Sequence, residues 1–267
     1  MFVTRSQLVR DLAALGVAPG DVVMVHSSMR AVGPVLGGPD VVVRAILDAA
    51  GPGGTVMAYT DWDHGLQSVS RDDAPEPFDS ARYDELPPFD PRSSRAQREN
   101  GVLPEFIRTT PGAVRSGNPD ASMAAVGARA EWLCADHPLD YGYGEGSPLA
   151  KLVEARGKVL MLGAPLDTVT LLHHAEHLAR LRGKRVIRYR EPMLVDGERR
   201  WVEIEEFDTG DPVVADAPDD YFATIAGAYL ETGRGRKGKV GHAESHVFDA
   251  PGLVDFAVKW MEERWGE

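Results

Sequence analysis

Apolar residues along this chain follow two patterns, one typical of buried strands and one typical of helices. Continuous apolar runs, which are found in strands buried on both faces of a sheet, predict strands at residues 22–25, 55–60 and 158–164. Apolar positions at helical spacing, bounded by capping residues, Pro or Gly, predict helices at 4–16, 40–50, 221–231, from 148 and from 251. This alternation of helices and strands is typical of an α/β protein with a mostly parallel central sheet.

Two segments depart from this alternation. Residues 61–98 lose all periodicity and are rich in Asp, Pro and Ser, which is typical of a functional or a disordered loop. From about 184 to 210, apolar and polar residues alternate around Asp196-Gly197, which predicts a β-hairpin with charged, exposed faces. The chain contains no internal repeat. We therefore interpret residues 1–267 as a single domain in which the hairpin forms a small subdomain.

Composition indicates which kinds of partner the protein can bind and in which cellular compartment it is expected. The chain carries 29 Lys and Arg against 41 Asp and Glu, so its net charge is −12. That charge argues against a surface built for nucleic acid phosphates and fits a cationic partner. The single cysteine, Cys134, excludes an internal disulfide framework and a Cys-rich zinc site, and it indicates a reducing compartment. No apolar run approaches the ~20 residues that span a bilayer, and the start resembles no secretory signal, so we expect a cytoplasmic protein without membrane contact.

Several common active-site motifs are missing from the sequence. No Gly-Lys pair is followed by Ser or Thr, so there is no phosphate-binding P-loop. No Gly-x-Ser-x-Gly is present, which removes the usual hydrolase nucleophile elbow. No Gly-x-Gly-x-x-Gly follows a strand, so a dinucleotide-binding fold has no support.

One predicted helix carries a candidate catalytic pair. On a helical wheel His173, Glu176 and Arg180 share one face, and Leu171 and Ala175 lie on the opposite, apolar side. An imidazole beside a carboxylate is a common way to hold a catalytic base in a fixed tautomer. The alternative is a solvated helix face with an ion pair between residues three apart.

The same helix offers a weaker metal-site hypothesis. His173 and His177 are four residues apart, which is metal-ligand spacing on a helix, and Glu176 or a distant residue would supply a third ligand. The motif His-Glu-x-x-His is absent, because His174 follows His173. His174 lies toward the apolar side, where we expect it to be a core residue. We expect no metal.

Polar residues at strand ends and in loops provide candidate binding sites. His26, Ser27 and Ser28 follow a buried strand, at the edge of an α/β sheet where ligands usually bind. Similar hydroxyls occur in the loop from Ser116 to Ser122, and in both places they would suit a polar cofactor arm or simply close a turn. Acidic residues in predicted loops could form a pocket for amines, or could be solvated surface groups: Asp61, Asp63, Glu145, Glu205, Glu206 and Asp208.

Taken together, these residues resemble one known family, the aminoglycoside 3-N-acetyltransferases of the antibiotic N-acetyltransferase fold. The resemblance extends over nearly the whole chain. It rests on Val25-His26-Ser27-Ser28, Gly33-Pro34-Val35, Gly51-Pro52-Gly53-Gly54-Thr55, Trp62-Asp63, Pro88-Phe89-Asp90-Pro91, Pro119-Asp120-Ala121-Ser122, Gly144-Glu145-Gly146-Ser147-Pro148, Leu162-Gly163-Ala164-Pro165-Leu166-Asp167, His173-x-Ala175-Glu176 and Phe248-Asp249-Ala250.

The resemblance implies a three-layer α/β/α fold and a reaction. The reaction is acetyl transfer from acetyl-CoA to the 3-amine of a 2-deoxystreptamine antibiotic, which gives resistance. The implied fold is not the GCN5-like one, whose Arg or Gln-x-x-Gly-x-Gly or Ala loop is also missing here. The protein would act as a monomer or homodimer with acetyl-CoA as co-substrate and no metal.

The resemblance also implies roles for individual residues. His173 is the implied general base and Glu176 the carboxylate that orients it. The coenzyme A arm is expected to contact His26, Ser27, Ser28, Ser116 and Ser122. The ammonium groups of the antibiotic are expected to contact Asp63, Glu145, Glu206 and Asp208. Asn118 stands where many relatives have His, so that ring has no counterpart here.

Three alternative functions remain open at this stage. The same fold could acetylate another small amine. A metal-dependent hydrolase could use His173, His177 and Glu176. A protein that only sequesters cationic antibiotics would bind them without releasing a thiol.

Overall fold

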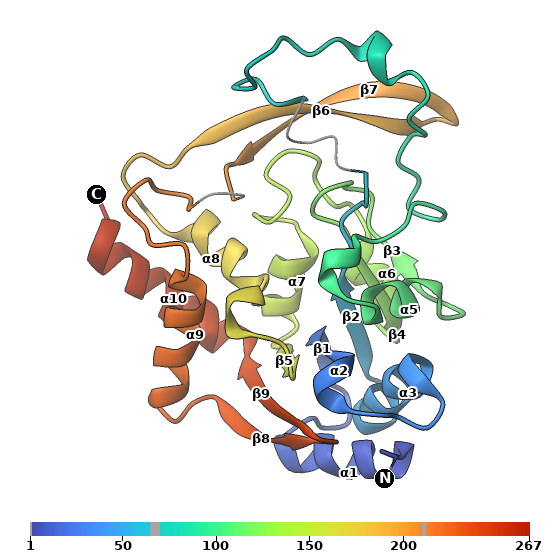
Figure 1. Cartoon of the computed structure of the whole chain (residues 1–267). Helices are drawn as coiled ribbons and strands as arrows, with labels where there is room; N and C mark the ends of the chain where they lie inside the picture. Colours follow the sequence, from blue (N-terminus) through green and yellow to red (C-terminus); the bar gives the residue numbers. More distant parts are fainter. Residues whose placement is uncertain (1, 65–69, 210–211) are drawn as a thin grey trace.

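The computed structural model describes residues 2–64, 70–209 and 212–267, and a seven-stranded sheet forms the centre of this part of the chain (Figure 1). The strand order is β3-β4-β2-β1-β5-β9-β8. The strands are β1 (Val22–Ser27), β2 (Thr55–Tyr59), β3 (Val114–Arg115), β4 (Met123–Gly127), β5 (Lys158–Leu162), β8 (Arg236–Val240) and β9 (Ala243–Asp249).

Parallel pairing is confined to the middle of the sheet. Strands β2, β1 and β5 run parallel, whereas the pairs toward both edges, β2–β4, β3–β4, β5–β9 and β8–β9, are antiparallel. The predicted parallel strands therefore form the centre, and short antiparallel strands extend it on either side. The apolar runs predicted the buried central strands but contained no signal for the direction of the outer ones.

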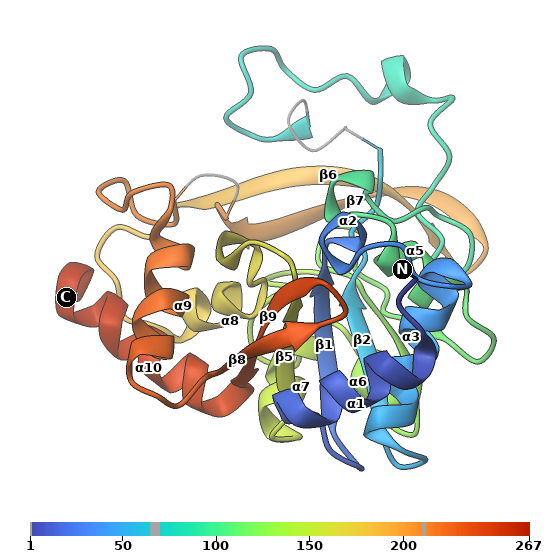
Figure 2. The same ribbon diagram turned by 60° about the horizontal axis from the view of Figure 1, so that its bottom comes forward.

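Helices cover both faces of this sheet, as the α/β/α expectation requires (Figure 2). Alternate side chains of β1 show the two faces. Val22 and Met24 belong to one apolar core, and Val23 and Val25 belong to the other. One layer contains α1 (Arg5–Leu15), α3 (Gly38–Ala50) and α5 (Leu103–Thr109), and the other contains α6 (Ala130–Cys134), α7 (Pro148–Glu154), α8 (Leu171–Leu178), α9 (Tyr221–Glu231) and α10 (Ala250–Trp265). The short α2 (Met29–Val32) follows β1.

A separate two-stranded hairpin, β6 (Val186–Val195) and β7 (Glu198–Phe207), lies across the ends of the central strands in both views. Its turn is the predicted Asp196-Gly197, with φ of 54° and 80°. Both values lie in the left-handed region that a tight hairpin turn of this type requires. The prediction of exposed faces is wrong for one side, because Glu191 and Ile204 are fully buried against the body of the protein.

The aperiodic segment predicted at 61–98 has local order on both sides of residues 65–69, which lie outside the described part. Trp62 forms an isolated bridge to Ala96. Two short 3-10 helices, Ser80–Tyr83 and Arg98–Asn100, interrupt the rest. The segment also contacts the hairpin, because Phe89 bridges Met193 of β6.

The single cysteine is buried at the sheet edge. The Cys134 thiol donates to the carbonyl oxygens of Val114, at 3.3 Å, and Met123, at 3.5 Å. Burial raises the pKa of this thiol to about 12. Within the described residues, no helix combines the length and the apolar character that crossing a bilayer demands.

Candidate active site

Three adjoining hollows meet at the ends of the central strands, and His173 lines all of them. The first, which we call the groove, has a volume of about 500 Å³ and is lined by residues that include His26, Ser27, Ser28, Asn100, Thr170 and Phe222. The second, which we call the acidic pocket, has a volume of about 190 Å³ and is lined by residues that include Asp61, Asp120, Tyr143, Glu206 and Asp208. The third lies beside Asp219 and Tyr221. His173 is therefore the side chain that joins a polar groove to an acidic pocket.

The pair predicted on α8 is formed. His173 Nδ1 lies 2.7 Å from Glu176 Oε2, and the Glu176 carboxylate is almost completely buried, whereas the imidazole remains 21% exposed. The hydroxyl of Tyr221, on α9, donates to the other oxygen, Oε1, of the same carboxylate. A buried carboxylate that accepts from Nδ1–H fixes the tautomer in which Nε2 can accept a proton.

The third member of the predicted helix face, Arg180, is not on the helix. Helix α8 ends at Leu178, and the Arg180 backbone N–H donates to Glu262 Oε1 at 2.9 Å instead of continuing the helical ladder. The expectation for Arg180 was wrong because periodicity alone did not show where the helix stops. The expectation for His174 is confirmed, because its side chain is buried and its Nδ1 lies 2.8 Å from the carbonyl oxygen of Tyr143.

His177 is engaged on both sides of its ring. Its Nδ1 lies 2.8 Å from the backbone carbonyl of His173, and its Nε2 lies 2.7 Å from Glu206 Oε1. A metal ligand needs a free ring nitrogen. This arrangement therefore gives no support to a zinc site shared by His173 and His177, on which the hydrolase alternative depends.

His26 and Ser27 lie at the carboxyl end of β1 and line the groove. His26 Nε2 and Ser27 Oγ are buried and have no hydrogen-bond partner among residues 2–64, 70–209 and 212–267. Burial, with a smaller contribution from His173, lowers the pKa of His26 to about 4, so this imidazole is neutral at physiological pH. Ser28 Oγ instead accepts from the Ala31 N–H at 3.3 Å. Two residues that line the groove thus each carry a buried polar atom that lacks a hydrogen bond.

Ser116 and Ser122, also predicted to contact the coenzyme, do not reach the groove. Ser116 Oγ lies 2.8 Å from His137 Nδ1 and accepts from the Met123 N–H at 2.9 Å. Ser122 Oγ donates to the Thr60 carbonyl oxygen at 2.8 Å. Both hydroxyls are buried and form hydrogen bonds at the β3–β4 edge of the sheet, so their role is structural.

The acidic pocket contains two of the four predicted acids. Glu206 lines it but shares its Oε1 with His177. Asp208 lines it too, and its Oδ2 lies 2.9 Å from Arg71 and 3.2 Å from Arg185. The other two, Asp63 and Glu145, do not line this pocket. Asp63 lies 3.3 Å from Arg98 Nε, and Glu145 is exposed in the loop before α7.

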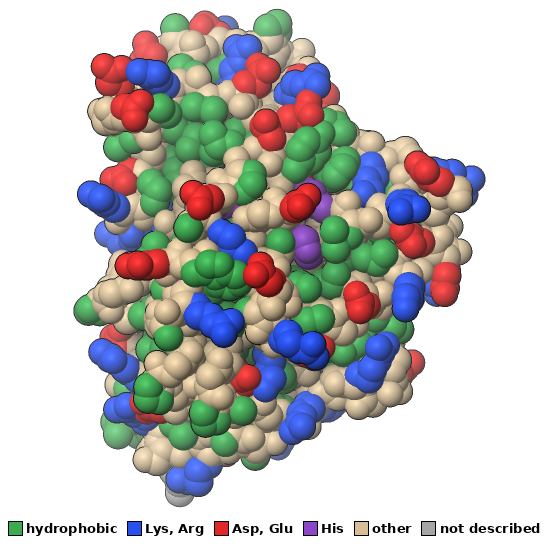
Figure 3. Space-filling model, turned by 180° about the vertical axis from the view of Figure 1, so that it is seen from behind, with side chains coloured by type: hydrophobic (Ala, Val, Ile, Leu, Met, Phe, Trp, Pro, Cys, Tyr) green, Lys and Arg blue, Asp and Glu red, His purple; other side chains and the backbone are tan. Residues whose placement is uncertain are grey.

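Two acids that the motif assignment did not select, Asp61 and Asp120, take the place of Asp63 and Glu145 in the pocket. Asp61 lies two residues after the end of β2, and His26 lies one residue before the end of β1, so both are close to a strand end. Burial, and then Asp120, raise the pKa of Asp61 to about 7, although a hydrogen bond from Asn100 opposes the shift. Figure 3 shows the face opposite that of Figure 1, on which acidic and basic side chains are interspersed and two histidine patches are visible. The residues that line the acidic pocket include four carboxylates: Asp61, Asp120, Glu206 and Asp208. The pocket thus offers carboxylates to a polycation.

Asn118 organises the loop that presents Asp120. Its Oδ1 accepts from the N–H groups of Asp120, at 3.0 Å, and Ala121, at 2.9 Å. Its Nδ2 donates to the carbonyl oxygens of Pro138 and Leu139, each at 3.0 Å. The buried amide thereby joins two loops behind the acidic pocket.

Comparisons with known proteins agree with one another. A family model described as aminoglycoside 3-N-acetyltransferase matches residues 24–262. The chain is 51% identical over 265 residues to aminoglycoside N(3)-acetyltransferase III of Pseudomonas aeruginosa, with coverage of 99% of this chain and 95% of that protein. It is 48% identical over 269 residues to aminoglycoside N(3)-acetyltransferase VII of Streptomyces paromomycinus, with coverage of 99% and 93%.

Solved structures match the fold over its full length. AAC-IIIb, in a binary complex with CoASH, superposes with a TM-score of 0.95 at 57% sequence identity, covering 100% of this chain and 98% of that chain. AAC-VIa bound to sisomicin superposes with a TM-score of 0.93 at 40% identity, covering 100% of both chains.

Proposed function

Because the chain belongs to the aminoglycoside 3-N-acetyltransferase family, we infer that it transfers the acetyl group of acetyl-CoA to the 3-amine of aminoglycosides and thereby gives resistance. We further propose that His173 is the general base. The single observation that carries this assignment is the position of His173, which lines both the polar groove and the acidic pocket while its Nδ1 is held by the buried Glu176.

We assign the groove to the binding of acetyl-CoA and the acidic pocket to the binding of the antibiotic. The unpartnered His26 Nε2 and Ser27 Oγ can hydrogen-bond the amide-rich arm of acetyl-CoA. Asp61, Asp120 and the pocket oxygens of Glu206 can bind ammonium groups, since charge-assisted hydrogen bonds to carboxylates are strong. This assignment places the thioester and the amine on two sides of one imidazole.

The reaction needs a neutral amine, because an ammonium group has no lone pair with which to attack a thioester. His173 Nε2 takes the proton, and Glu176 stabilises the resulting imidazolium through Nδ1. The amine nitrogen then bonds to the carbonyl carbon of the thioester, and the tetrahedral intermediate expels the coenzyme A thiolate. As the intermediate collapses, the attacking nitrogen loses a second proton. One of the two protons converts the thiolate to the thiol and the other passes to solvent, so an ammonium group and a thioester give an amide, a free thiol and one H⁺.

We propose direct transfer without an acetyl-enzyme. Cys134 is buried at the sheet edge and does not line the groove, so its thiol is not available as a nucleophile. The dependence on acetyl-CoA and the reduced state expected for a lone cysteine support a cytoplasmic location.

The decisive experiment measures thiol release from acetyl-CoA with purified protein and a small panel of aminoglycosides. The panel includes one compound whose 3-amine is absent or blocked. Release with the open compounds and none with the blocked compound is the expected result. Release with both groups alike would contradict the regiochemistry, and release only with simpler amines would favour the same fold acetylating another substrate.

A further inference from the structure

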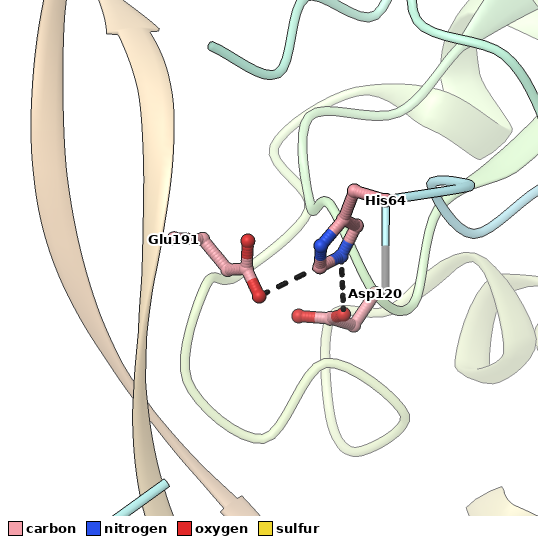
Figure 4. A group of neighbouring side chains, drawn as sticks. All are labelled: His64, Asp120 and Glu191. Carbon is pink, nitrogen blue, oxygen red and sulfur yellow. Dashed lines mark ion pairs between the residues drawn. The ribbon is translucent and has the colours of Figure 1, made fainter. Parts of the chain in front are cut away.

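Beside the acidic pocket, His64, Asp120 and Glu191 bring three ionisable side chains together from distant parts of the chain (Figure 4). His64 follows β2, Asp120 precedes β4, and Glu191 belongs to β6. His64 Nε2 lies 3.7 Å from Asp120 Oδ1 and 3.6 Å from Glu191 Oε1. These separations are too long for hydrogen bonds. His64 is nevertheless within ion-pair distance of both carboxylates.

Glu191 is the group that demands an explanation. Its side chain is 0% exposed, and neither of its oxygens accepts a hydrogen bond from a residue that the structure describes. Asp120 Oδ2 is buried without a partner as well. A buried carboxylate that accepts no hydrogen bond carries a large desolvation penalty. Protonation of Glu191 would remove its charge and create one O–H donor. That donor could satisfy at most one acceptor, so at least one buried oxygen of the cluster would still lack a hydrogen bond.

We propose that His64, Asp120 and Glu191 form a binding site for a divalent cation of the zinc type. One imidazole nitrogen and two carboxylates are a donor set that Zn²⁺ accepts, with ligand bonds of about 2.0–2.2 Å. At tetrahedral angles two ligand atoms on one zinc ion lie about 3.4 Å apart, so the separations of 3.7 and 3.6 Å from His64 are a few tenths of an ångström too long. All three ligand atoms lie within 4.8 Å of one another, so binding requires only a small movement of the two carboxylates.

The location favours a compact ion over an ammonium group of the substrate. The side chains of His64 and Glu191 are 4% and 0% exposed, so a group attached to an antibiotic ring has little access to them. Only Asp120 also lines the acidic pocket. A cation here would fix the orientation of Asp120 and would tie the hairpin to the loops at the ends of β2 and β4. Its role would be structural, and this inference does not depend on the proposed reaction.

The test is zinc binding by the full chain, measured without substrate. Protein freed of metal with a chelator is titrated with Zn²⁺ by calorimetry, and its melting temperature is recorded with and without the ion. We expect one ion per chain and a melting temperature that rises with Zn²⁺, because a ligand that binds the folded state stabilises it. Parallel titrations with Mg²⁺ should show weaker binding, since imidazole is a poor ligand for that ion.

Glu191→Gln is the diagnostic variant and Glu203→Gln its matched control. Gln has nearly the shape of protonated Glu, so the first variant should fold and yet lose the zinc-dependent rise. Glu203 lies on the same hairpin, half-exposed and paired with Arg190, and its variant should retain the rise. The proposal would be wrong if the unmodified chain does not bind zinc stoichiometrically. It would also be wrong if Glu191→Gln still binds zinc. A stabilisation by aminoglycoside alone that Glu191→Gln abolishes would overturn it too, since the site would then belong to the substrate. Thiol release, measured separately, reports on the proposed reaction.

Discussion

The Tyr221 hydroxyl donates a hydrogen bond to Oε1 of Glu176, the carboxylate whose Oε2 holds Nδ1 of His173. Helix α9 thereby orients a carboxylate on α8, and the chain of contacts ends at the imidazole between the groove and the acidic pocket. Tyr221 acts through Glu176 and is in this sense a positioning residue.

Replacing Tyr221 by Phe should lower kcat by about 10-fold and leave KM for the aminoglycoside nearly unchanged. The physical reason is the loss of one hydrogen bond to a charged group, which is worth roughly 1.5–3 kcal/mol. Steady-state kinetics measures the two parameters separately. Tyr229→Phe, on the same helix but outside the three hollows, is the control and should be neutral. A rise in KM with unchanged kcat would show that Tyr221 serves binding instead.

The His173→Ala variant should lose the general base and with it a factor of about 10²–10⁴ in turnover. Binding of coenzyme A, followed by calorimetry, should be largely retained because the groove keeps its other polar groups. His242→Ala removes an exposed imidazole that does not line the groove, and it should turn over normally. Unchanged turnover in His173→Ala would contradict the assignment of the base.

We predict that Asp61 makes antibiotic binding depend on pH near neutrality. With its pKa raised to about 7 by burial and then by Asp120, it is neutral below that pH and negative above it. Asp61→Asn should therefore raise KM by about 10-fold at pH 8.5, where a charge-assisted bond is lost. At pH 5.5 the variant and the parent should differ little.

The control for this experiment is Asp63→Asn. Asp63 lies outside the acidic pocket and faces Arg98, so its variant should change KM little at either pH.

At pH 8.5 the Asp61→Asn substitution should raise the free energy of unfolding although it weakens binding of the antibiotic. Because the folded pKa of Asp61 is raised above 3.8, ionisation opposes folding, and the stability contributed by the protonated group is lost as pH rises through 7. Asp61→Asn should thus gain stability relative to the parent at pH 8.5.

Asn118→Ala should lower the free energy of unfolding by about 2–4 kcal/mol, because four hydrogen bonds of a buried amide are lost at once. Urea denaturation followed by tryptophan fluorescence measures the change. Asp79→Ala, which removes an exposed cap to the Ala81 N–H, should cost about 1 kcal/mol or less. Equal losses in the two variants would contradict the role assigned to Asn118.

Sequence patterns predicted those features of the site that depend on residues close together in the chain. The three-residue spacing of His173 and Glu176 placed them together because one helical turn brings such residues onto one face. The polar residues after the apolar run at 22–25 predicted a site at a strand end, where His26 and Ser27 now line the groove. Both predictions needed only the geometry of a single element.

Contacts between distant segments could not be predicted in this way. Tyr221 reaches Glu176 across 45 positions, and no periodicity connects them. Asp61 and Asp63 are two residues apart in one loop, and only the folded path of that loop decides which of them faces the pocket. Ser116 has a hydroxyl as suitable as that of Ser27, but its antiparallel neighbour Met123 uses that hydroxyl as an acceptor.

The burial of Cys134 has a practical consequence for every thiol assay on this protein. Cys134 is only 5% exposed and burial raises the pKa of its thiol to about 12, so the folded protein should give very little colour with a disulfide dye. Nearly all colour in a turnover experiment therefore comes from coenzyme A. In denaturant Cys134 becomes exposed and reactive. The rate of dye labelling without substrate then reports the rate at which the protein unfolds. Cys134 therefore adds little signal to the turnover assay, and in denaturant the rate of its labelling measures unfolding.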